Sequence, residues 1–569
     1  MYFGTLESAN PAQILIDQQI AQFEKSIQQL KNQRNQNSSI TRLPPEILGK
    51  IFAEAAYTET GEKLGKAPSP AERFNFSFVS QHWRSVAIST PEVWGILPDG
   101  YVEWCQIMLG RSKTTDLTVA INLLTPGSTR ETFVKEVTSY HVHRLQELTI
   151  RFSSIATQRI LDGFPASAPR LHILRLMFAT FGSMDPGLTL PDHSFSDAHL
   201  STLELKGCNL NWKSPLFTGL RSLKLTIGNT HATSRADFYE ALKRMPGLEV
   251  LDIDNFNPSD SLVFDQSIPL CSLQQLCITS TSSSALNILQ YLAVPVSVMV
   301  DLRCSAPLPT QTQTNAEAAR STLTSTISRF FSSMIGDNPG DAPQYHTIFV
   351  SRQSWFAIEA WRKPWIYSSP SVARTDKANF ALRIYASDPF LAEILSTIPL
   401  SQIKTLSIST HLTQTFLMAN FGNLPKLNTV VVNGGSPVIT QLFKALTSKK
   451  NNKASYYRVV FPHLQHLIMY GAIFSEQDEV DYITVNSLRD CLMERSERGA
   501  PIQKLSILDC FDINKDEIQL LEELVVDVDW DGVEMEYEDE DDEEDLEEDS
   551  DYYSDEDDFD DEYNYIDYL

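Results

Sequence analysis

The sequence predicts an α/β fold: a small helical domain, then an irregular repeat solenoid built as a curved, mostly parallel sheet with outer helices. Three observations lead to this prediction. They are two short amphipathic segments near the N-terminus, a leucine phrase that recurs along most of the chain, and a strong separation of charge. A length of 569 residues also exceeds one ordinary compact core, which favours several domains or one repeat array.

Charge divides the chain into a neutral body and an acidic end. The net charge is −27, but the stretch from Asp527 to Leu569 alone holds 25 Asp or Glu and no Lys or Arg. The rest holds 48 acidic against 46 basic residues. This balance excludes a general nucleic-acid binder, which needs a positive surface. We divide the chain into a helix at 11–35, a helical domain at 40–97, a solenoid with insertions at 98–532 and an acidic disordered tail at 533–569.

The first predicted helix begins at Pro11, since proline favours the first helical position. Large apolar residues then alternate at spacings of four and three, which is the seam of a coiled coil. The seam covers only about two heptads, which is short for an independent coiled coil. Two interpretations stay open, a helix that packs on its own protein and a helix that dimerises. The seam residues are Ile16, Ile20, Phe23, Ile27 and Leu30.

Two further amphipathic helices are predicted in residues 40–97. A proline-initiated helix after Leu43-Pro44-Pro45 places Ile47, Leu48, Ile51 and Phe52 together on one face. A second helix is expected where Phe76, Val79, Trp83 and Val86 recur at helical spacing, and Thr90-Pro91 ends it. So much apolar surface in so few residues exceeds what a small core needs.

This segment resembles the F-box, whose pattern is L-P-x-E-[IL]-[IL]-x-x-I-[FL], then V-[CS]-x-x-W-[RK]-x-[LVI]-A and S-P-x-[LV]-W. The insert from Tyr57 to Asn75 departs from the family, because it is longer and more polar and lacks the aspartate-leucine turn. The matching residues are Leu43, Pro44, Glu46, Ile47, Ile51, Phe52, Val79, Ser80, Trp83, Arg84, Ala87, Pro91 and Trp94. The resemblance implies binding to the Skp-type adaptor of a cullin–RING ubiquitin ligase, with Leu43, Pro44, Ile47, Ile51, Val79 and Trp83 at the contact positions.

The phrase L-x-x-L-x-L recurs after this domain. The first six copies are 20 to 29 residues apart, which is the leucine-rich-repeat range. Its fourth and sixth residues point to one face of a short strand, and stacked neighbours bury that face in a continuous core. The phrases start at Leu145, Leu171, Leu200, Leu220, Leu248, Leu273, Ile403, Leu427, Leu464 and Ile502.

Between Thr279 and Ser401 the leucine phrase is missing. Strands are still expected around Val300, Phe349 and Leu382, and a helix with one apolar face includes Ile327 and Phe331. We therefore expect the solenoid to continue through this region with long helical insertions.

The strand residues between the leucines are expected to face the concave surface, where such solenoids bind proteins. Their mixed charge predicts a surface that reads one protein, although any single one of them is more simply a solvated strand residue. The tentative substrate-binding set is Arg151, Arg175, Glu204, Lys206, Lys224, Asp252, Asp254, His466 and Tyr470.

Sequence motifs for catalysis, a metal or a cofactor are missing. The stretch from Gly61 to Ala67 does not fit the spacing of a phosphate-binding loop, and no G-x-S-x-G elbow occurs. His141, His143, His463 and His466 lack the partners of a zinc site. We therefore expect a chain that is not an enzyme and has no cofactor.

Cysteine use and the N-terminus indicate the compartment. The seven cysteines are scattered without a C-x-x-C pair, which favours a reducing environment. The chain shows no secretory signal at its start and no apolar run long enough to span a membrane. Cytoplasm or nucleus is expected, with no membrane partner.

The layout is similar to that of a large family of fungal F-box proteins with degenerate leucine-rich repeats. It implies a substrate-recognition subunit of an SCF-type ligase, bound to a Skp-type adaptor and cullin scaffold and to a protein substrate. The rival is a non-enzymatic scaffold that binds histones, because the tail from Glu536 onward is a polyanion suited to a basic partner.

Overall fold

The chain forms two compact units. Unit 1 contains the described residues up to Phe178 together with Leu188–Leu200, and unit 2 contains those from Ser201 onward. In this computed structural model the described residues are 11–58, 73–97, 102–123, 129–152, 158–178, 188–209, 211–227, 234–256, 267–305, 313–334, 342–352, 355–364, 377–384, 388–450, 458–474 and 483–534. Nearly all of the predicted acidic tail (from Met535) and most of the polar insert (59–72) lie outside these ranges.

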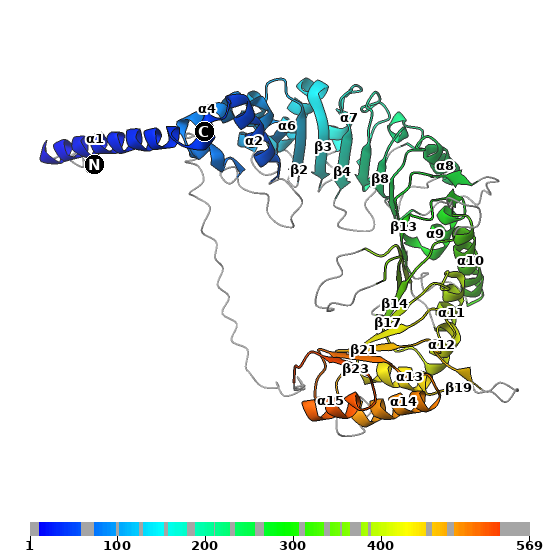
Figure 1. The fold of residues 1–569 in the computed structure, drawn as a ribbon. Coiled ribbons are helices and arrows are strands. Elements are labelled where there is room, and N and C mark those ends of the chain that lie inside the picture. Colours follow the sequence, from blue (N-terminus) through cyan, green and yellow to red (C-terminus); the bar gives the residue numbers. More distant parts are fainter. Residues whose placement is uncertain are drawn as a thin grey trace, which may run out of the picture. The chain divides into compact units, whose positions relative to one another are not determined.

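Unit 1 opens with helices (Figure 1). They are α1 (Pro11–Gln36), η1 (Ser39–Arg42), α2 (Pro45–Thr58), η2 (Asn75–Phe78), α4 (Gln81–Ser89) and η3 (Pro91–Trp94). The helix expected from Phe76 begins only at Gln81, because the Ser80 side chain accepts a hydrogen bond from the Trp83 backbone N–H and caps the helix there. A single 3-10 turn, η2, takes the place of its expected first turn.

A parallel sheet follows in unit 1. Its strands are paired in the order β1–β2–β3–β4, and helices occupy the connections. Val119, Leu148 and Leu174 stand in one row across β2, β3 and β4. The elements are β1 (Ile96–Leu97), α5 (Val102–Arg111), β2 (Leu117–Leu123), α6 (Thr129–Tyr140), η4 (Val142–Arg144), β3 (Leu145–Phe152), α7 (Gln158–Asp162), β4 (Ile173–Phe178) and β5 (Leu188–Thr189).

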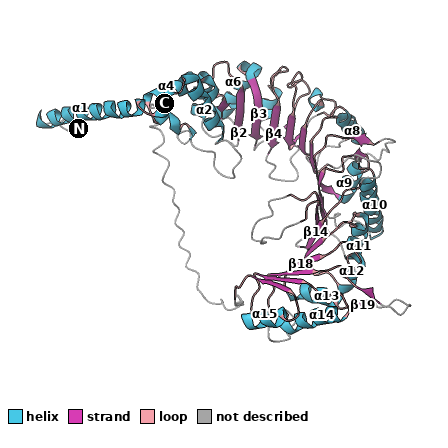
Figure 2. Cartoon of the chain, viewed as in Figure 1, coloured by secondary structure: helices cyan, strands magenta, loops and turns pink. Residues whose placement is uncertain are grey.

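Unit 2 repeats this pattern, with its larger helices along one side of the strands (Figure 2). Its first half consists of β6 (Thr202–Lys206), β7 (Cys208–Asn209), η6 (Pro215–Phe217), β8 (Ser222–Thr226), α8 (Arg235–Lys243), β9 (Val250–Asp254), β10 (Ile268–Pro269), β11 (Gln275–Thr281), α9 (Ser282–Leu289), β12 (Leu292–Ala293), β13 (Met299–Ser305) and α10 (Gln313–Ser332).

The second half of unit 2 follows α10 and starts with two strands. Its elements are β14 (Thr347–Arg352), β15 (Phe356–Trp361), β16 (Phe380–Ile384), α11 (Asp388–Thr397), β17 (Thr405–Ser409), α12 (Gln414–Asn420), β18 (Thr429–Asn433), α13 (Ser436–Leu446), β19 (Lys449–Lys450), β20 (Arg458–Val459), β21 (His466–Tyr470), α14 (Val485–Glu497), β22 (Lys504–Leu508), α15 (Lys515–Glu522) and β23 (Asp527–Trp530).

The strand order of unit 2 departs from a simple solenoid at one place. Strands β6, β8, β9, β11 and β13 are parallel neighbours, as are β14, β17, β18, β21, β22 and β23. Between them, β16 pairs in parallel with β13, while β15 is antiparallel to both β16 and β14. Strands thus occur at the expected residues of 279–401, and the sheet continues through them with α10 as an inserted helix, but β15 runs in the reverse direction.

The leucine phrase builds the core. Each of its positions is almost fully buried, and the register stacks them in rows. Leu223, Leu251 and Leu276 form one such row on β8, β9 and β11. On the later strands Leu467 and Leu505 are paired in the same way. Because these side chains alternate with polar ones, one sheet face is apolar and meets the helices, while the other carries the charged residues.

A positive φ recurs directly after the strands. It is found at Gly207, Asn255, Gly434, Gly471 and Asp509, which follow β6, β9, β18, β21 and β22. Glycine, asparagine and aspartate tolerate this conformation best. The backbone N–H of Asn255 still donates to the carbonyl of Thr279 at 2.7 Å, so the residue continues the ladder while it turns the chain.

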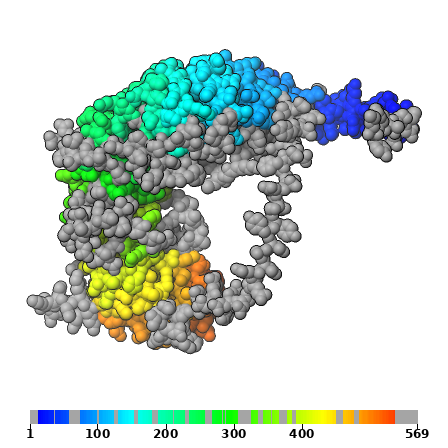
Figure 3. Space-filling view, turned by 180° about the vertical axis from the view of Figure 1, so that it is seen from behind, coloured from blue at the N-terminus to red at the C-terminus, as the bar shows by residue number. Residues whose placement is uncertain are grey.

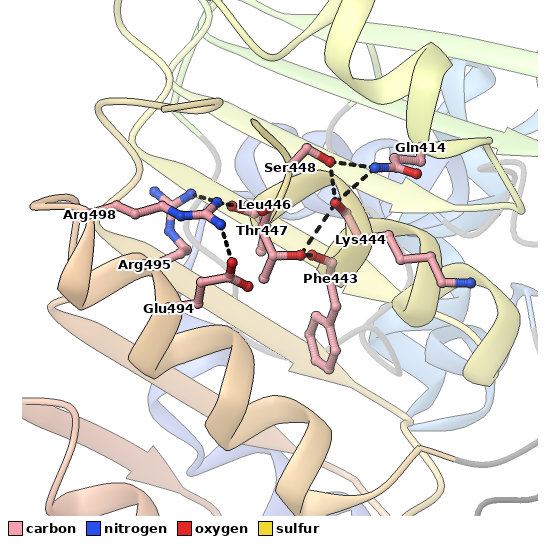
Figure 4. A network of polar contacts seen from close by, with 9 residues as sticks. All are labelled: Gln414, Phe443, Lys444, Leu446, Thr447, Ser448, Glu494, Arg495 and Arg498. Carbon is pink, nitrogen blue, oxygen red and sulfur yellow. Dashed lines mark hydrogen bonds and ion pairs between the residues drawn. The ribbon is translucent and has the colours of Figure 1, made fainter. Parts of the chain in front are cut away.

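The later repeats are joined by a buried polar network around Arg495 on α14 (Figure 4). Its guanidinium donates to the carbonyl oxygens of Val460 at 3.1 Å and Phe461 at 3.0 Å, and at 3.4 Å to that of Leu446 at the end of α13. Burial lowers the pKa of Arg495 to about 10. The side chain thus satisfies backbone carbonyls of the preceding repeat that the strand and helix hydrogen bonds leave over.

Candidate protein-binding surfaces

The helical segment 40–97 has an aromatic core. Phe52 on α2 stacks on Phe76 with 4.5 Å between ring centroids and meets Trp83 at 5.2 Å. Phe74 stacks on Trp94 at 4.7 Å, and the indole N–H of Trp94 donates to the carbonyl of Ala87 at 2.8 Å. These contacts hold α2, α4 and η3 together.

Close packing of α2 depends on a glycine. A Cβ atom at Gly49 would lie 2.6 Å from Oγ1 of Thr90, closer than real contacts allow. The backbone of α2 therefore approaches the end of α4 directly, and Thr90 is held there by a 2.8 Å hydrogen bond from its Oγ1 to the carbonyl of Val86.

The apolar residues of α2 separate into two sets. Leu48 and Phe52 are buried, with 0% and 2% of their surface exposed, whereas Ile47 and Ile51 are 44% and 45% exposed. The four residues expected on one face thus divide between the core and the surface. Val79, just before α4, is 51% exposed. We call Ile47, Ile51 and Val79 the apolar face of unit 1.

The other residues expected at the adaptor contact differ in exposure. Pro44 is exposed, and Leu43 and Trp83 are partly exposed. Trp83 also belongs to the core through its ring contact with Phe52. Replacement of Trp83 therefore tests both packing and binding, whereas the apolar face tests binding alone.

A second candidate surface lies on the strands of unit 2. One row across the sheet runs through Lys224 on β8, Asp252 on β9, Cys277 on β11 and Asp301 on β13, and two steps further it reaches Glu359 on β15. Neighbouring strands are about 4.8 Å apart. The row therefore presents a mixed set of charges across several strands.

A second row lies two residues further along these strands. It contains Asp254 on β9, Arg303 on β13 and Arg383 on β16. Asp301 accepts from Arg303 at 2.9 Å and from Arg383 at 2.6 Å, and Arg383 also pairs with Glu359 at 3.0 Å. Acidic and basic side chains of the two rows thus hold one another in place.

Apart from Asp254, the residues named in these rows line a cavity of about 550 Å³. Lys224, Asp252 and Arg383 contribute charged walls, and Met299 and Trp361 contribute apolar ones. Burial raises the pKa of Asp252, an effect that Lys224 partly offsets and Asp254 strengthens. The pKa of Arg303 is raised by its hydrogen bond to Asp301. The cavity offers polar and apolar contacts side by side, which suits a protein side chain better than a polyanion.

The structure distributes the tentative substrate-binding residues over three places. Lys224 on β8 and Asp252 on β9 line the cavity, Asp254 lies on β9 as well, and Glu204 and Lys206 lie on the neighbouring strand β6. Arg151 and Arg175 belong to unit 1, where Arg175 pairs with Glu147 at 3.7 Å.

His466 and Tyr470 lie on β21, far along the strand order from β9. Nε2 of His466 is 2.9 Å from Oγ of Ser506, and the Tyr470 hydroxyl donates to Asp509. Burial and nearby Lys504 lower the pKa of His466. Only Lys224 and Asp252 of the tentative set therefore line the cavity.

Sequence reasoning missed most of the cavity. Asp301, Arg303, Glu359, Lys377 and Arg383 lie in the region without the leucine phrase. A weaker signal was present, because Asp301 and Arg303 alternate with the buried Val300, Leu302 and Cys304 on β13. The position of Glu359 depends on the reversed strand β15 and had no comparable signal.

Chemistry of other kinds has little support in the described residues. They contain no group of three His, Cys, Asp or Glu side chains placed to hold a metal ion. Within the same ranges, no helix has both the length and the apolar character to cross a membrane. All seven cysteines are unbridged, and only Cys271 is exposed.

Comparison with known proteins adds no relative. A scan against models of protein families and a search of curated proteins gave no match to this chain.

Proposed function

We propose that the chain is the substrate-recognition subunit of an SCF-type cullin–RING ubiquitin ligase, an F-box protein with degenerate leucine-rich repeats. Residues 40–97 would bind the Skp-type adaptor, and the strand face of the repeats would bind a protein substrate. The resemblance of 40–97 to the F-box motif names the partner. The observation that carries the proposal is the exposure of Ile47, Ile51 and Val79, which the core of their own domain leaves in solvent.

The apolar face is suited to a partner because its exposure to water is unfavourable in free energy, and binding removes it from water. Burial of an aliphatic side chain contributes roughly 1.5–3 kcal/mol, so two or three such residues dominate a small interface. Leu48 and Phe52 hold α2 in place on the other side. The domain therefore presents Ile47 and Ile51 on a rigid helix, with little ordering cost on binding.

The strand face supports the second part of the proposal, the binding of a protein substrate. Its charges are mixed in sign and held by ion pairs around Asp301 and Arg383, so it offers directional contacts without a field that attracts one class of ion. In this function the chain breaks and forms no bond itself. It holds the substrate near a ubiquitin-charged conjugating enzyme, which makes transfer effectively intramolecular. Cytoplasm or nucleus is the compartment where such a ligase acts.

The proposal is tested by capture of a purified Skp-type adaptor on the full chain. We expect Ile47→Asp with Ile51→Asp to weaken binding by more than about 100-fold, since two buried aliphatic contacts are lost and two charges are desolvated. Melting of the variant should match wild type, because both residues are exposed.

The matched control replaces exposed aliphatic residues elsewhere. Leu520 and Leu524 near the end of unit 2 are 46% and 37% exposed, and Leu520→Asp with Leu524→Asp should leave adaptor capture unchanged. Equal capture of the adaptor by wild type and by the Ile47/Ile51 variant would contradict the adaptor proposal.

A further inference from the structure

Helix α1 carries an apolar stripe that nothing in the described residues covers. Its large apolar side chains are between 45% and 68% exposed, and Figure 3 shows the helix in dark blue with its side chains on the outside. The stripe consists of Ile16, Ile20, Phe23, Ile27 and Leu30, and Ile14 and Leu15 are exposed on other sides of the helix. An uncovered stripe of this length on one helix marks a contact surface.

The spacing of the stripe fits a helix of the same kind. From Ile16 to Leu30 the spacings are four, three, four and three, which is the a/d repeat of a left-handed coiled coil. Ile20 and Ile27 then occupy a positions, and Ile16, Phe23 and Leu30 occupy d positions. An identical helix presents the same knobs and holes at the same intervals, so the surface is complementary to itself.

The residues that flank the stripe allow a pair of identical helices in either orientation. The e positions hold Asp17, Glu24 and Lys31, and the g positions hold Gln19, Ser26 and Gln33. In a parallel pair each e residue faces a g residue of the other helix, so each charge faces a neutral side chain and no like charges meet. In an antiparallel pair e faces e, which brings the two Glu24 carboxylates together but also places Asp17 opposite Lys31 on both sides.

The base of α1 is tied to the helical segment. The side-chain amide of Asn35 donates to the carbonyl of Val79 at 3.2 Å, next to the apolar face. The stripe itself ends at Leu30, before this contact. The contact at Asn35 and the stripe therefore use different residues, and both can form in one molecule.

We propose that the chain forms a dimer through α1, with the seam of Ile16, Ile20, Phe23, Ile27 and Leu30 packed against the same seam of a second copy. This inference is independent of the ligase function, because the seam shares no residue with the apolar face. The seam is short, so the dimer dissociates on dilution.

Sedimentation of the full chain over a dilution series up to about 100 µM tests the proposal. Wild type is expected to shift from 64.1 kDa to twice that mass as concentration rises. Phe23→Glu with Ile27→Glu should raise the dissociation constant more than about 100-fold. Gln18→Glu with Gln29→Glu adds the same charge on the outer side of α1 and should leave the dimer intact. A wild type that stays monomeric throughout, or equal loss in both variants, overturns the proposal.

Orientation is tested by cross-linking. In a Cys271→Ser background, which removes the exposed native thiol, Ile16→Cys gives a disulfide-linked dimer on mild oxidation if the two helices are parallel, because residue 16 of the two copies lies side by side only in that orientation. A dimer in sedimentation that does not cross-link at this position has its helices antiparallel. Adaptor capture by the Phe23/Ile27 variant should match wild type, so failure of the dimer and failure of the ligase proposal are told apart.

Discussion

Arg495 shows how a charged residue can be a structural part of an interior. Its side chain is fully buried, and its partners among the described residues are backbone carbonyls and no carboxylate. Removal of the guanidinium leaves carbonyls of α13 and of the loop before β21 without donors. A buried acceptor that loses its donor costs its full desolvation energy.

We expect Arg495→Met to lower the free energy of unfolding of the C-terminal repeats by about 2–4 kcal/mol, because several hydrogen bonds from one charged group are lost together. Hydrogen exchange of α13 and β21 measures the loss locally. Arg221 is a matched control: it is 70% exposed and paired with Glu249, so Arg221→Met should cost less than about 1 kcal/mol. Equal effects of the two substitutions would contradict the structural role of Arg495.

His466 gives the second expectation at this scale, a dependence of stability on pH. Burial lowers the pKa of His466 in the folded chain below its usual value of about 6.5. As pH falls through 6.5, the unfolded chain takes up a proton that the folded chain resists, so stability falls with pH. His466→Gln should reduce this loss between pH 7 and 5, measured as unfolding midpoints. His463→Gln, at an exposed position, serves as the control and should keep the wild-type profile; an unchanged profile in His466→Gln would be the contrary result.

At the scale of elements, periodicity predicted the strands well where the leucine phrase is present. The phrase fixes which side chains are buried, and each of its positions is in the core. Apolar alternation alone also predicted the approximate positions of β13, β14 and β16, which lack the leucine phrase. Helix boundaries were harder, because Val79 fits a helical spacing yet lies before the cap at Ser80.

Strand β15 had no sequence signal of its direction. Phe356, Ala357 and Ile358 are consecutive and buried, so no alternation separates its faces. Direction in a sheet is set by the pairing of distant segments, which a local pattern does not contain. The cavity next to β15 was missed for the same reason, since Glu359 faces it only because β15 pairs with β16.

Helix α2 shows a similar limit on a smaller scale. Ile47 and Leu48 are adjacent and both apolar, so the sequence assigned them one face. Only packing against α4 and η3 decides that Leu48 turns inward and Ile47 outward. The adaptor positions were named from the motif, and their exposure had to come from the structure.

At the scale of the whole molecule, the charge is concentrated at one end. Removal of residues after Glu534 eliminates 21 of the 73 acidic residues and no basic one, which changes the net charge from −27 to −6. Both α15 and β23 end before this point, so the folded elements stay complete.

Truncation after Glu534 should therefore change the free energy of unfolding by less than about 0.5 kcal/mol, as for surface changes in general. Adaptor capture should also be unchanged. Binding to purified histones, the expectation of the rival scaffold function, should be lost with the tail and should weaken with salt in the intact chain. Unchanged histone binding after truncation would remove the tail from that function.

The reversed strand β15 has a consequence for how unit 2 is made. In a simple repeat array each new strand pairs with the one just synthesised, so the growing edge is covered at once. Here β13 pairs with β16, which is synthesised later: Arg383 follows its partner Asp301 by 82 residues. Strand β14 likewise lacks its neighbours β15 and β17 until they have been synthesised. During synthesis the edge of β13 is open to other chains. The sheet from β13 to β17 therefore stays incompletely paired until β16 and β17 have been made.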